Sequence, residues 1–160
     1  MSKEGAKDIL IIGIGNSCRS DDGLGWLMLD AIKKKFLNAE LVYRYQLQIE
    51  DAELLSHYGT VIFIDATKEE TKNGFFFKPC YPNNGIGLSS HILEPETILW
   101  LEHQLYKTEP ATFVLGIEGK KWGLSLQPSQ VARSNLLKAK DFLVKNINRI
   151  MASEKPFVLQ

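Results

Sequence analysis

The sequence predicts an α/β protein: a single three-layer α/β/α domain with a twisted, mostly parallel five-stranded sheet and helices on both faces. Short apolar runs alternate with segments of helical periodicity along almost the whole chain, which is the pattern of folds built from β-α-β units. The chain has 160 residues, 44% of them hydrophobic, enough to fill the core of one domain. We expect this domain over residues 1–150 and a loosely ordered tail over residues 151–160.

The first half of the chain holds three of the predicted strands. Ile9–Ile14 is a continuous apolar run, typical of a strand that is buried on both faces. A helix is predicted from Leu24, because apolar residues then recur every three or four positions as far as Ile32. The elements expected next are a strand over Glu40–Leu47, a short helix over Glu50–Tyr58 and a strand over Val61–Ile64 that Asp65 ends.

The second half of the chain begins with a strand that we expect to be peripheral and antiparallel, over Phe75–Lys78. A loop rich in Gly, Asn and Pro follows over Pro79–Ser90. The elements expected after it are a helix from Pro95 to Tyr106, a strand over Thr112–Ile117 and a last helix from Pro128 to Ile150. Gln127 precedes the last helix and is a poor N-cap, where Ser or Thr would be expected.

Charge and cysteine content exclude several classes of protein. Lys and Arg number 19, as do Asp and Glu, and a chain without a basic excess lacks the electrostatic footprint of a nucleic-acid-binding protein. Cys18 and Cys80 form no Cys-x-x-Cys pair, which suits a reducing compartment and argues against a disulfide scaffold or a structural zinc site. Neither an apolar signal core nor an apolar run of roughly 20 residues, the length that spans a bilayer, is present. We expect a cytoplasmic monomer with neither nucleic acid nor membrane as partner.

Polar residues follow three of the predicted strands. Open α/β sheets bind ligands at the carboxyl ends of their strands, near the switch point between the first and third strands. The loop Gly13–Gly25 follows the first strand and contains Asp22, Asp65 ends the third strand, and His91 comes after the fourth. Two carboxylates and one imidazole at one edge can form an oxygen and nitrogen site for a divalent transition metal, and three protein ligands leave positions open for an exogenous group.

Each of these residues also has a plain structural interpretation. The loop Gly13–Gly25 departs from both the dinucleotide-binding fingerprint and the P-loop, and the adjacent Asp21 and Asp22 would repel a pyrophosphate. The two acids suit a helix N-terminus equally well, because the helix dipole favours negative charge there. Asp65 can be a turn residue and His91 a surface histidine. The prediction of a site therefore rests on the three residues occurring together at one edge of the predicted sheet.

A series of short motifs runs through the chain between residues 9 and 147. They are Gly13-x-Gly15-Asn16, Asp21-Asp22-Gly23-x-Gly25, Tyr45-Gln46-Leu47, Glu50-Asp51-Ala52-Glu53-Leu54, Ile64-Asp65-Ala66, Ser90-His91 with Pro95, Gly116-Ile117-Glu118 and Gly123-Leu124-Ser125. In this order they resemble the signature of the [NiFe]-hydrogenase maturation endopeptidases. Such proteins remove a short C-terminal extension from the large-subunit precursor of a [NiFe] hydrogenase after nickel has been inserted.

The resemblance implies an endopeptidase whose partner and substrate is a hydrogenase large-subunit precursor. The metal-site positions of that family carry over onto Asp22, Asp65 and His91, which would be the catalytic and the metal-binding residues. The resemblance further implies that the nickel belongs to the precursor and that the resting protein holds no tightly bound metal. The chain departs from many members at Ser17–Ser20, where Cys18 has no assigned counterpart.

Two other functions remain open. The same site would serve a nickel-dependent assembly factor that holds the large subunit without cutting it. A cysteine hydrolase would use Cys18 as nucleophile, His91 as base and Asp65 as the group that orients the base. Two carboxylates beside Cys18 would disfavour the reactive thiolate, which argues against the hydrolase.

Overall fold

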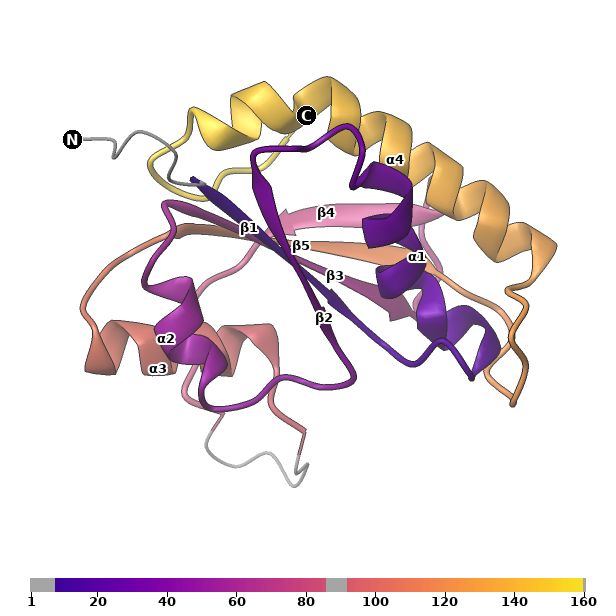
Figure 1. Ribbon diagram of the computed structural model, residues 1–160, viewed down its shortest axis with the longest axis horizontal. Helices are drawn as coiled ribbons and strands as arrows, with labels where there is room; N and C mark the ends of the chain where they lie inside the picture. The colour runs from indigo at the N-terminus through magenta and orange to yellow at the C-terminus, as the bar shows by residue number, and fades with distance from the viewer. Residues whose placement is uncertain (1–7, 86–91, 160) are drawn as a thin grey trace.

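Five strands form one sheet in the middle of the structure, in the order β2-β1-β3-β5-β4 (Figure 1). The computed structural model describes residues 8–85 and 92–159. The strands are β1 (Ile9–Ile14), β2 (Ala39–Arg44), β3 (Thr60–Thr67), β4 (Phe75–Pro79) and β5 (Ala111–Glu118). Neighbouring strands run parallel except β4, which is antiparallel to β5 at one edge. The predicted fold class, with its antiparallel peripheral strand, is confirmed.

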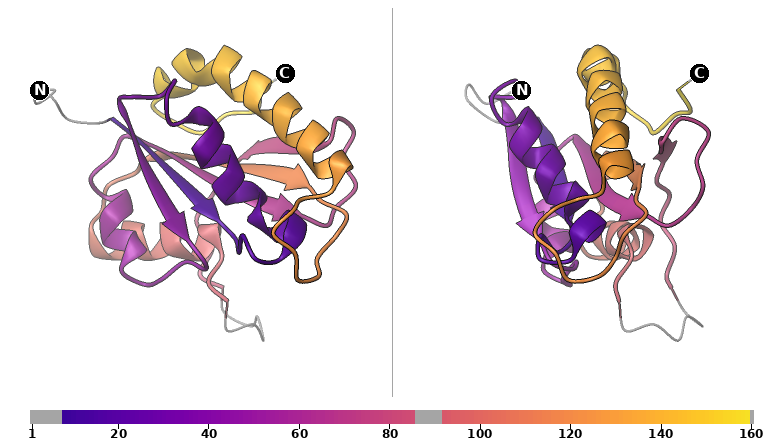
Figure 2. Two further views of the ribbon diagram at one scale, coloured as in Figure 1. Left: turned by 45° about the vertical axis from the view of Figure 1, so that its right-hand side comes forward. Right: turned by 90° about the vertical axis from the view of Figure 1, so that its right-hand side faces the viewer.

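Helices cover both faces of the sheet (Figure 2). They are the 3₁₀ turn η1 (Ser20–Gly23) and the helices α1 (Leu24–Ile32), α2 (Asp51–Leu55), α3 (Pro95–Leu105) and α4 (Gln130–Met151). α1 and α4 contact each other on one face, and α2 and α3 contact each other on the opposite face. None of the described helices combines the length and the apolar character that crossing a bilayer requires.

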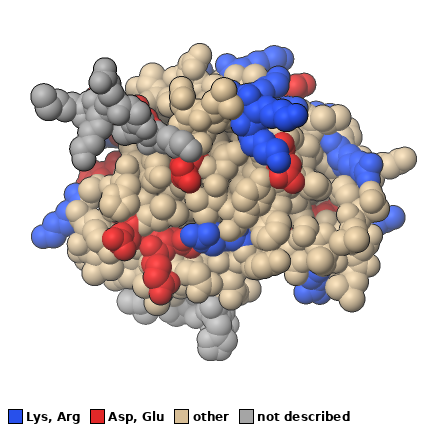
Figure 3. All heavy atoms as spheres, in the orientation of Figure 1, with Lys and Arg blue, Asp and Glu red and all other residues tan. Residues whose placement is uncertain are grey.

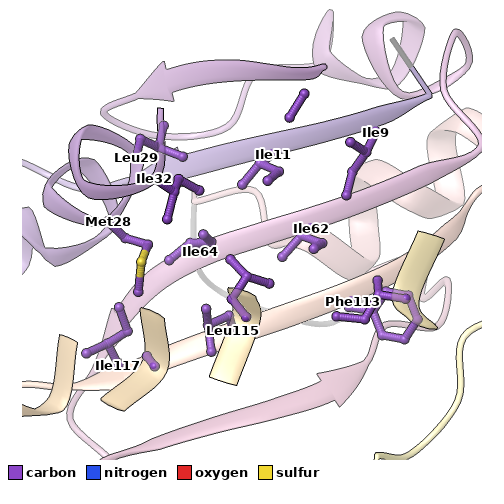
Figure 4. Packing of buried hydrophobic residues seen from close by; sticks show 14 of the residues in the cluster. Ile9, Ile11, Met28, Leu29, Ile32, Ile62, Ile64, Phe113, Leu115 and Ile117 are labelled. Carbon is purple, nitrogen blue, oxygen red and sulfur yellow. The ribbon is translucent and has the colours of Figure 1, made fainter. Parts of the chain in front are cut away.

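The two faces of the sheet carry separate apolar cores, because successive side chains of a strand point to opposite sides. Ile9 and Ile11 of β1 lie in the core beneath α1 and α4 (Figure 4). Leu10 and Ile12 lie in the core on the side of α2 and α3. All four side chains are buried. A strand that is apolar on both faces reads as an uninterrupted apolar run, which is why Ile9–Ile14 could be placed from the sequence.

The ends of two strands differ from the prediction. β2 stops at Arg44, opposite Ile14, where its partner β1 also stops, although the apolar pattern predicts a strand over Glu40–Leu47. β3 continues beyond Asp65 to Thr67, because the longer β5 still pairs with it there. Strand ends therefore follow from the length of the partner strand, and a local sequence pattern does not contain that information.

An ion pair ties the carboxyl end of β2 to α2. Nη2 of Arg44 lies 3.0 Å from Oδ1 of Asp51. Oδ2 of the buried Asp51 also accepts a hydrogen bond of 2.9 Å from the backbone N–H of Gln48. Figure 3 shows that acidic side chains gather over α2 on this face. The pair compensates the burial of the Asp51 carboxylate, which is costly for an unpaired charge, and it sets the connection between β2 and α2.

The last helix begins later than predicted. Ser129 is its N-cap: the backbone there is extended, with φ −65° and ψ 158°, and the hydroxyl oxygen accepts a hydrogen bond of 3.2 Å from Ala132 N–H. The expectation of a helix starting at Pro128 behind a poor N-cap, Gln127, is therefore corrected. Ser129 satisfies one of the N–H groups that the first helical turn leaves without an intrahelical partner.

The residues after α4 pack on the core. The ring of Phe157 meets that of Phe113 edge to face, with centroids 5.5 Å apart. The guanidinium of Arg149 lies over the same ring, 5.4 Å from the centroid of Phe157, and Leu159 also packs against this core. These contacts are made by residues of the segment 151–160, which the sequence analysis expects to be a loosely ordered tail, and an aromatic side chain that buries its surface helps to hold such a segment.

Candidate active site

The start of α1 lies directly against the ends of β1 and β3. A Cβ atom added to Gly25 would lie 2.4 Å from the carbonyl oxygen of Ile14 and 2.6 Å from that of Ile64. Only glycine permits so close an approach of backbone to backbone. The contact brings the turn before α1, which contains Asp22, to the carboxyl edge of the sheet.

Asp65 stands where β1 and β3 part. Gly13 opposite Ile64 is the last pair between these two strands, whereas Asp65 still pairs with Gly116 of β5. This is the switch point of the sheet, at which open α/β folds bind their ligands. The structure thus places both predicted aspartates, Asp22 and Asp65, at the same edge.

Backbone hydrogen bonds close the loop that carries Asp22. Arg19 N–H donates to Asn16 O (3.1 Å), and Asp22 N–H donates to Arg19 O (3.1 Å). Asn16 N–H donates in turn to Asp22 O (3.0 Å). At Gly15, which has φ +151°, a Cβ atom would lie 2.0 Å from the Asp22 carbonyl oxygen, so glycine is required. The conformation of the Asp22 backbone within this loop is therefore set by the loop itself.

Asp21, the residue before Asp22, is fully buried and bonds to the loop between β5 and α4. Its Oδ2 accepts hydrogen bonds from the N–H groups of Lys120 (2.6 Å) and Lys121 (2.8 Å) and from the hydroxyl of Ser129 (2.7 Å). Its Oδ1 accepts another from the N–H of Ser129 (2.7 Å). Burial by itself raises the pKa of this carboxyl, but the four donors together hold it below its usual value.

Both adjacent acids lie in the first turn of η1, as the helix-dipole interpretation expects, but neither caps a helix through its side chain. Neither η1 nor α1, both within the described part of the chain, has a side-chain hydrogen bond at its N-cap. Asp21 instead connects the turn to the loop between β5 and α4 through hydrogen bonds. Asp22 lies at the same edge of the sheet as Asp65, and its charge acts on that residue. Two neighbouring residues of one type therefore have different surroundings.

The charges of two other carboxylates act on Asp65. Burial raises its pKa to about 7, against the lowering effect of a 2.8 Å hydrogen bond from Ala66 N–H to Oδ1, and the charges of Asp22 and Glu94 raise it further. The carboxyl of Asp65 therefore titrates near neutral pH. A cation placed between these groups would favour its ionised form.

Glu94 is a residue of this region that the sequence analysis did not name. It directly precedes Pro95, the first residue of α3, and lines a small cavity of about 150 Å³ together with Asp65. Burial and then the charge of Glu96 raise the pKa of Glu94. An acid before a helix-starting proline is ordinary in any sequence, so no local signal marked it.

The third predicted ligand, His91, lies outside the described residues. Among residues 8–85 and 92–159 there is no group of three or more His, Cys, Asp or Glu side chains arranged to hold a metal ion. The structure therefore brings together two members of the predicted trio, Asp22 and Asp65. It adds Glu94 beside them.

Cys18 belongs to the same loop as Asp22. Its thiol is free and exposed, whereas Cys80 is buried. The backbone of Cys18 is held at both sides, because its N–H donates to Oδ1 of Asn16 (2.9 Å) and its carbonyl oxygen accepts from Ser125 N–H (3.0 Å). The residue thus contributes main-chain bonds to the framework of the loop.

The fold and the paired acids at the switch point can now be compared with known proteins. No family model matches the sequence, and no curated protein does. Solved structures do match: the class of protein that shares this fold is that of the [NiFe] hydrogenase maturation proteases.

Three of these structures illustrate the likeness. HycI from Thermococcus kodakarensis KOD1 has a TM-score of 0.69 and 20% sequence identity, over 89% of this chain and 93% of its own. The endopeptidase HybD from E. coli has a TM-score of 0.65 and 14% identity, over 88% and 92%. The hydrogenase 2 maturation peptidase from Thaumarchaeota archaeon SCGC_AB-539-E09 has a TM-score of 0.64 and 20% identity, over 89% and 99%. Identities this low establish a shared fold.

Proposed function

We propose that this protein is an endopeptidase that removes the C-terminal extension of a [NiFe]-hydrogenase large-subunit precursor after nickel insertion. Asp22, Asp65 and His91 recognise the nickel, which the precursor carries. The proposal includes a soluble, monomeric, cytoplasmic protein with a protein substrate. It is supported by the shared fold and by the motifs that accompany each of these residues in the sequence.

The observation that carries the proposal is the electrostatic coupling of two carboxylates at the switch point. The charge of Asp22 contributes to a pKa of about 7 at Asp65, and Glu94 adds to it. Uncompensated carboxylates that repel one another favour a bound cation. A substrate that brings its own divalent ion relieves this repulsion, whereas a metal-free substrate does not.

The donor set fits nickel held by the substrate. Asp22 and Asp65 offer anionic oxygens and His91 offers an imidazole nitrogen, a combination suited to a divalent transition metal. The two aspartates come from different segments of the chain, η1 and β3. A ligand set gathered from separate loops binds free metal weakly, but binds it better when contacts with the precursor add to the affinity.

The alternatives differ in their products. A nickel-dependent assembly factor would hold the same nickel-loaded precursor at full length, without cutting it. A cysteine hydrolase would cut, but would depend on Cys18, whose exposed thiol lies in the loop of Asp22. Both retain the fold and the site, so only chemistry separates them.

The experiment that tests the proposal is incubation of the protein with a nickel-loaded large-subunit precursor, followed by mass analysis of the precursor's C-terminus. We expect a single new C-terminus and release of one short peptide. Full-length precursor that stays bound to the protein would favour the assembly factor and overturn the endopeptidase. An unrelated metalloprotein with an exposed C-terminus serves as the substrate control.

A further inference from the structure

We infer that Asp21 is a positioning residue: its carboxylate holds the η1 turn against the loop between β5 and α4 and so determines where Asp22 lies. The inference rests on the proposed function, because it concerns the same site. It assigns Asp21 no contact with the substrate.

The tie itself is unusually complete. The carboxylate of Asp21 is fully buried and accepts four hydrogen bonds, three from backbone N–H groups and one from the hydroxyl of Ser129. Asp21 N–H also donates to the carbonyl oxygen of Lys121 (3.0 Å). Charge-assisted hydrogen bonds of this kind are stronger than neutral ones. The two segments, distant in sequence, lie side by side in both views of Figure 2.

The turn that is tied down contains a strained residue. Ser20 has φ +51°, in the left-handed region that residues other than glycine rarely adopt. Ser20 N–H donates to Ser125 O (2.8 Å), and its hydroxyl donates to Gln127 O (3.0 Å). The same loop therefore holds both Ser20 and Asp21. Without it, the turn would be free to relax away from this conformation.

A displacement at Asp21 would pass directly to Asp22. The Asp22 backbone is bonded on one side to Arg19 and on the other to Asn16, so the loop moves as a unit. Asp65, by contrast, is carried by the pairing of β3 with β5 and would stay in place. Losing the tie would therefore change the separation of Asp22 and Asp65, and a misplacement of about 1 Å costs on the order of 100-fold in rate.

The test uses the full-length protein and four variants. Asp21→Ala removes both carboxylate oxygens, which accept four of the hydrogen bonds. Asp21→Asn keeps one oxygen acceptor but turns an amide toward a donor. Ser129→Ala removes one donor from the far side. Leu143→Ala is the control, because it truncates a fully buried core side chain of α4 and destabilises the fold elsewhere. Each is measured by amide hydrogen exchange over residues 16–23 and by single-turnover cleavage of nickel-loaded precursor.

We expect Asp21→Ala to raise the rate of amide exchange over residues 16–23 by about tenfold beyond any change in the rest of the protein. In Leu143→Ala, exchange over residues 16–23 should rise no more than the global loss of stability accounts for. Cleavage at saturating precursor should fall by about 100-fold with Asp21→Ala, with precursor affinity within about threefold of wild type. Asp21→Asn and Ser129→Ala should lie between Asp21→Ala and wild type. The split between affinity and turnover is what a loss of overall stability would not produce.

Equal local exchange in Asp21→Ala and Leu143→Ala would overturn the inference, as would a cleavage defect that only mirrors the unfolded fraction. If Asp21→Ala fails to fold, Ser129→Ala decides by the same two measurements. Amide exchange over residues 16–23 that equals wild type in that variant would contradict the inference. If the wild-type protein does not cut precursor, the proposed function fails. Amide exchange then still decides whether Asp21 holds the turn.

Discussion

The charge of Asp22 raises the pKa of Asp65, although the two residues come from separate segments that meet only at the carboxyl edge of the sheet. Asp22 is held by a loop that closes on itself through its own backbone. Asp65 is held by the pairing of β3 with β5. Because main-chain bonds carry both residues, either side chain can be changed without removing the support of the other.

The first prediction concerns stability and pH. The pKa of Asp65 is about 7, against 3.8 for an ordinary Asp. The folded protein therefore keeps a proton that the unfolded chain loses, and the free energy of unfolding falls as the pH rises between these two values. Asp65→Asn removes this loss, and its amide oxygen can still accept the hydrogen bond from Ala66. In urea unfolding, the variant should exceed wild type by about 4 kcal/mol at about pH 8 and lie within about 0.5 kcal/mol of it near pH 4.

The control for that measurement is Asp141→Asn, which changes an exposed aspartate of α4. It should shift stability by less than about 0.5 kcal/mol at either pH. A difference between Asp65→Asn and wild type that is the same at both pH values would show that Asp65 does not titrate as described.

The second prediction concerns processing. Asp22→Asn and Asp65→Asn should each lower the rate of precursor cleavage by at least about 100-fold, since even changes to the outer partners of metal ligands cost 10–100-fold. The physical reason is that an amide of equal shape supplies a neutral oxygen in place of an anionic one. Circular dichroism should show an intact fold in both. Wild-type cleavage rates in both variants would remove nickel recognition from the proposal, and Asp141→Asn again gives the reference rate.

The third prediction concerns nickel. Nickel-loaded precursor should be cut, and nickel-free precursor should persist even at high concentrations of the protein. The charges of Asp22 and Glu94 act on Asp65, and in the proposed function a substrate that brings a cation relieves this repulsion. The measurement is the mature-length product from matched loaded and nickel-free preparations. Product from the nickel-free preparation at a comparable rate would leave a plain peptidase, without gating.

The fourth prediction concerns Cys18. Cys18→Ser should retain most of the activity, within about threefold of wild type, because the contacts that the structure gives this residue are made by its backbone. Cleavage of nickel-loaded precursor is again the measurement. Complete loss in a folded variant would instead support the cysteine hydrolase.

The fifth prediction compares two glycines. Gly25→Ala should destabilise the protein by about 3 kcal/mol, because its Cβ would lie 2.4 Å from a carbonyl oxygen of β1 and force the start of α1 away from the sheet. Gly123→Ala is the matched control, since nothing lies within 4 Å of a Cβ atom there. Both are measured by urea unfolding. Equal stability of the two variants would contradict the close approach of α1 to the strand ends.

Much of the fold could be predicted because hydrophobic periodicity is a local property. The run Ile9–Ile14 and the helical spacing after Leu24 each contain their own signal, and the structure has β1 and α1 where these patterns predict them. The end of β2 and the start of α4 were misplaced. Each depends on a partner outside the segment: the length of β1 for the one, and the capping bond of Ser129 for the other.

Some residues of the candidate site could likewise be predicted from the sequence, and others could not. The alternation of strands and helices put Asp22 and Asp65 at one edge of a parallel sheet, because the carboxyl ends of parallel strands meet there. Glu94 comes close to Asp65 only because α3 packs against the sheet. The local sequence around Glu94 does not predict this position.

The sequence was thus sufficient for the order of elements and for the meeting of Asp22 with Asp65, since both follow from periodicity and connection rules. The resemblance selected Asp22 as the site residue, but only the tertiary structure showed what its neighbour Asp21 does. The two are adjacent, identical in chemistry and equally suited to a helix start. The hydrogen-bond donors to the Asp21 carboxylate belong to Lys120, Lys121 and Ser129. They reach Asp21 only when the β5–α4 loop folds back over the turn.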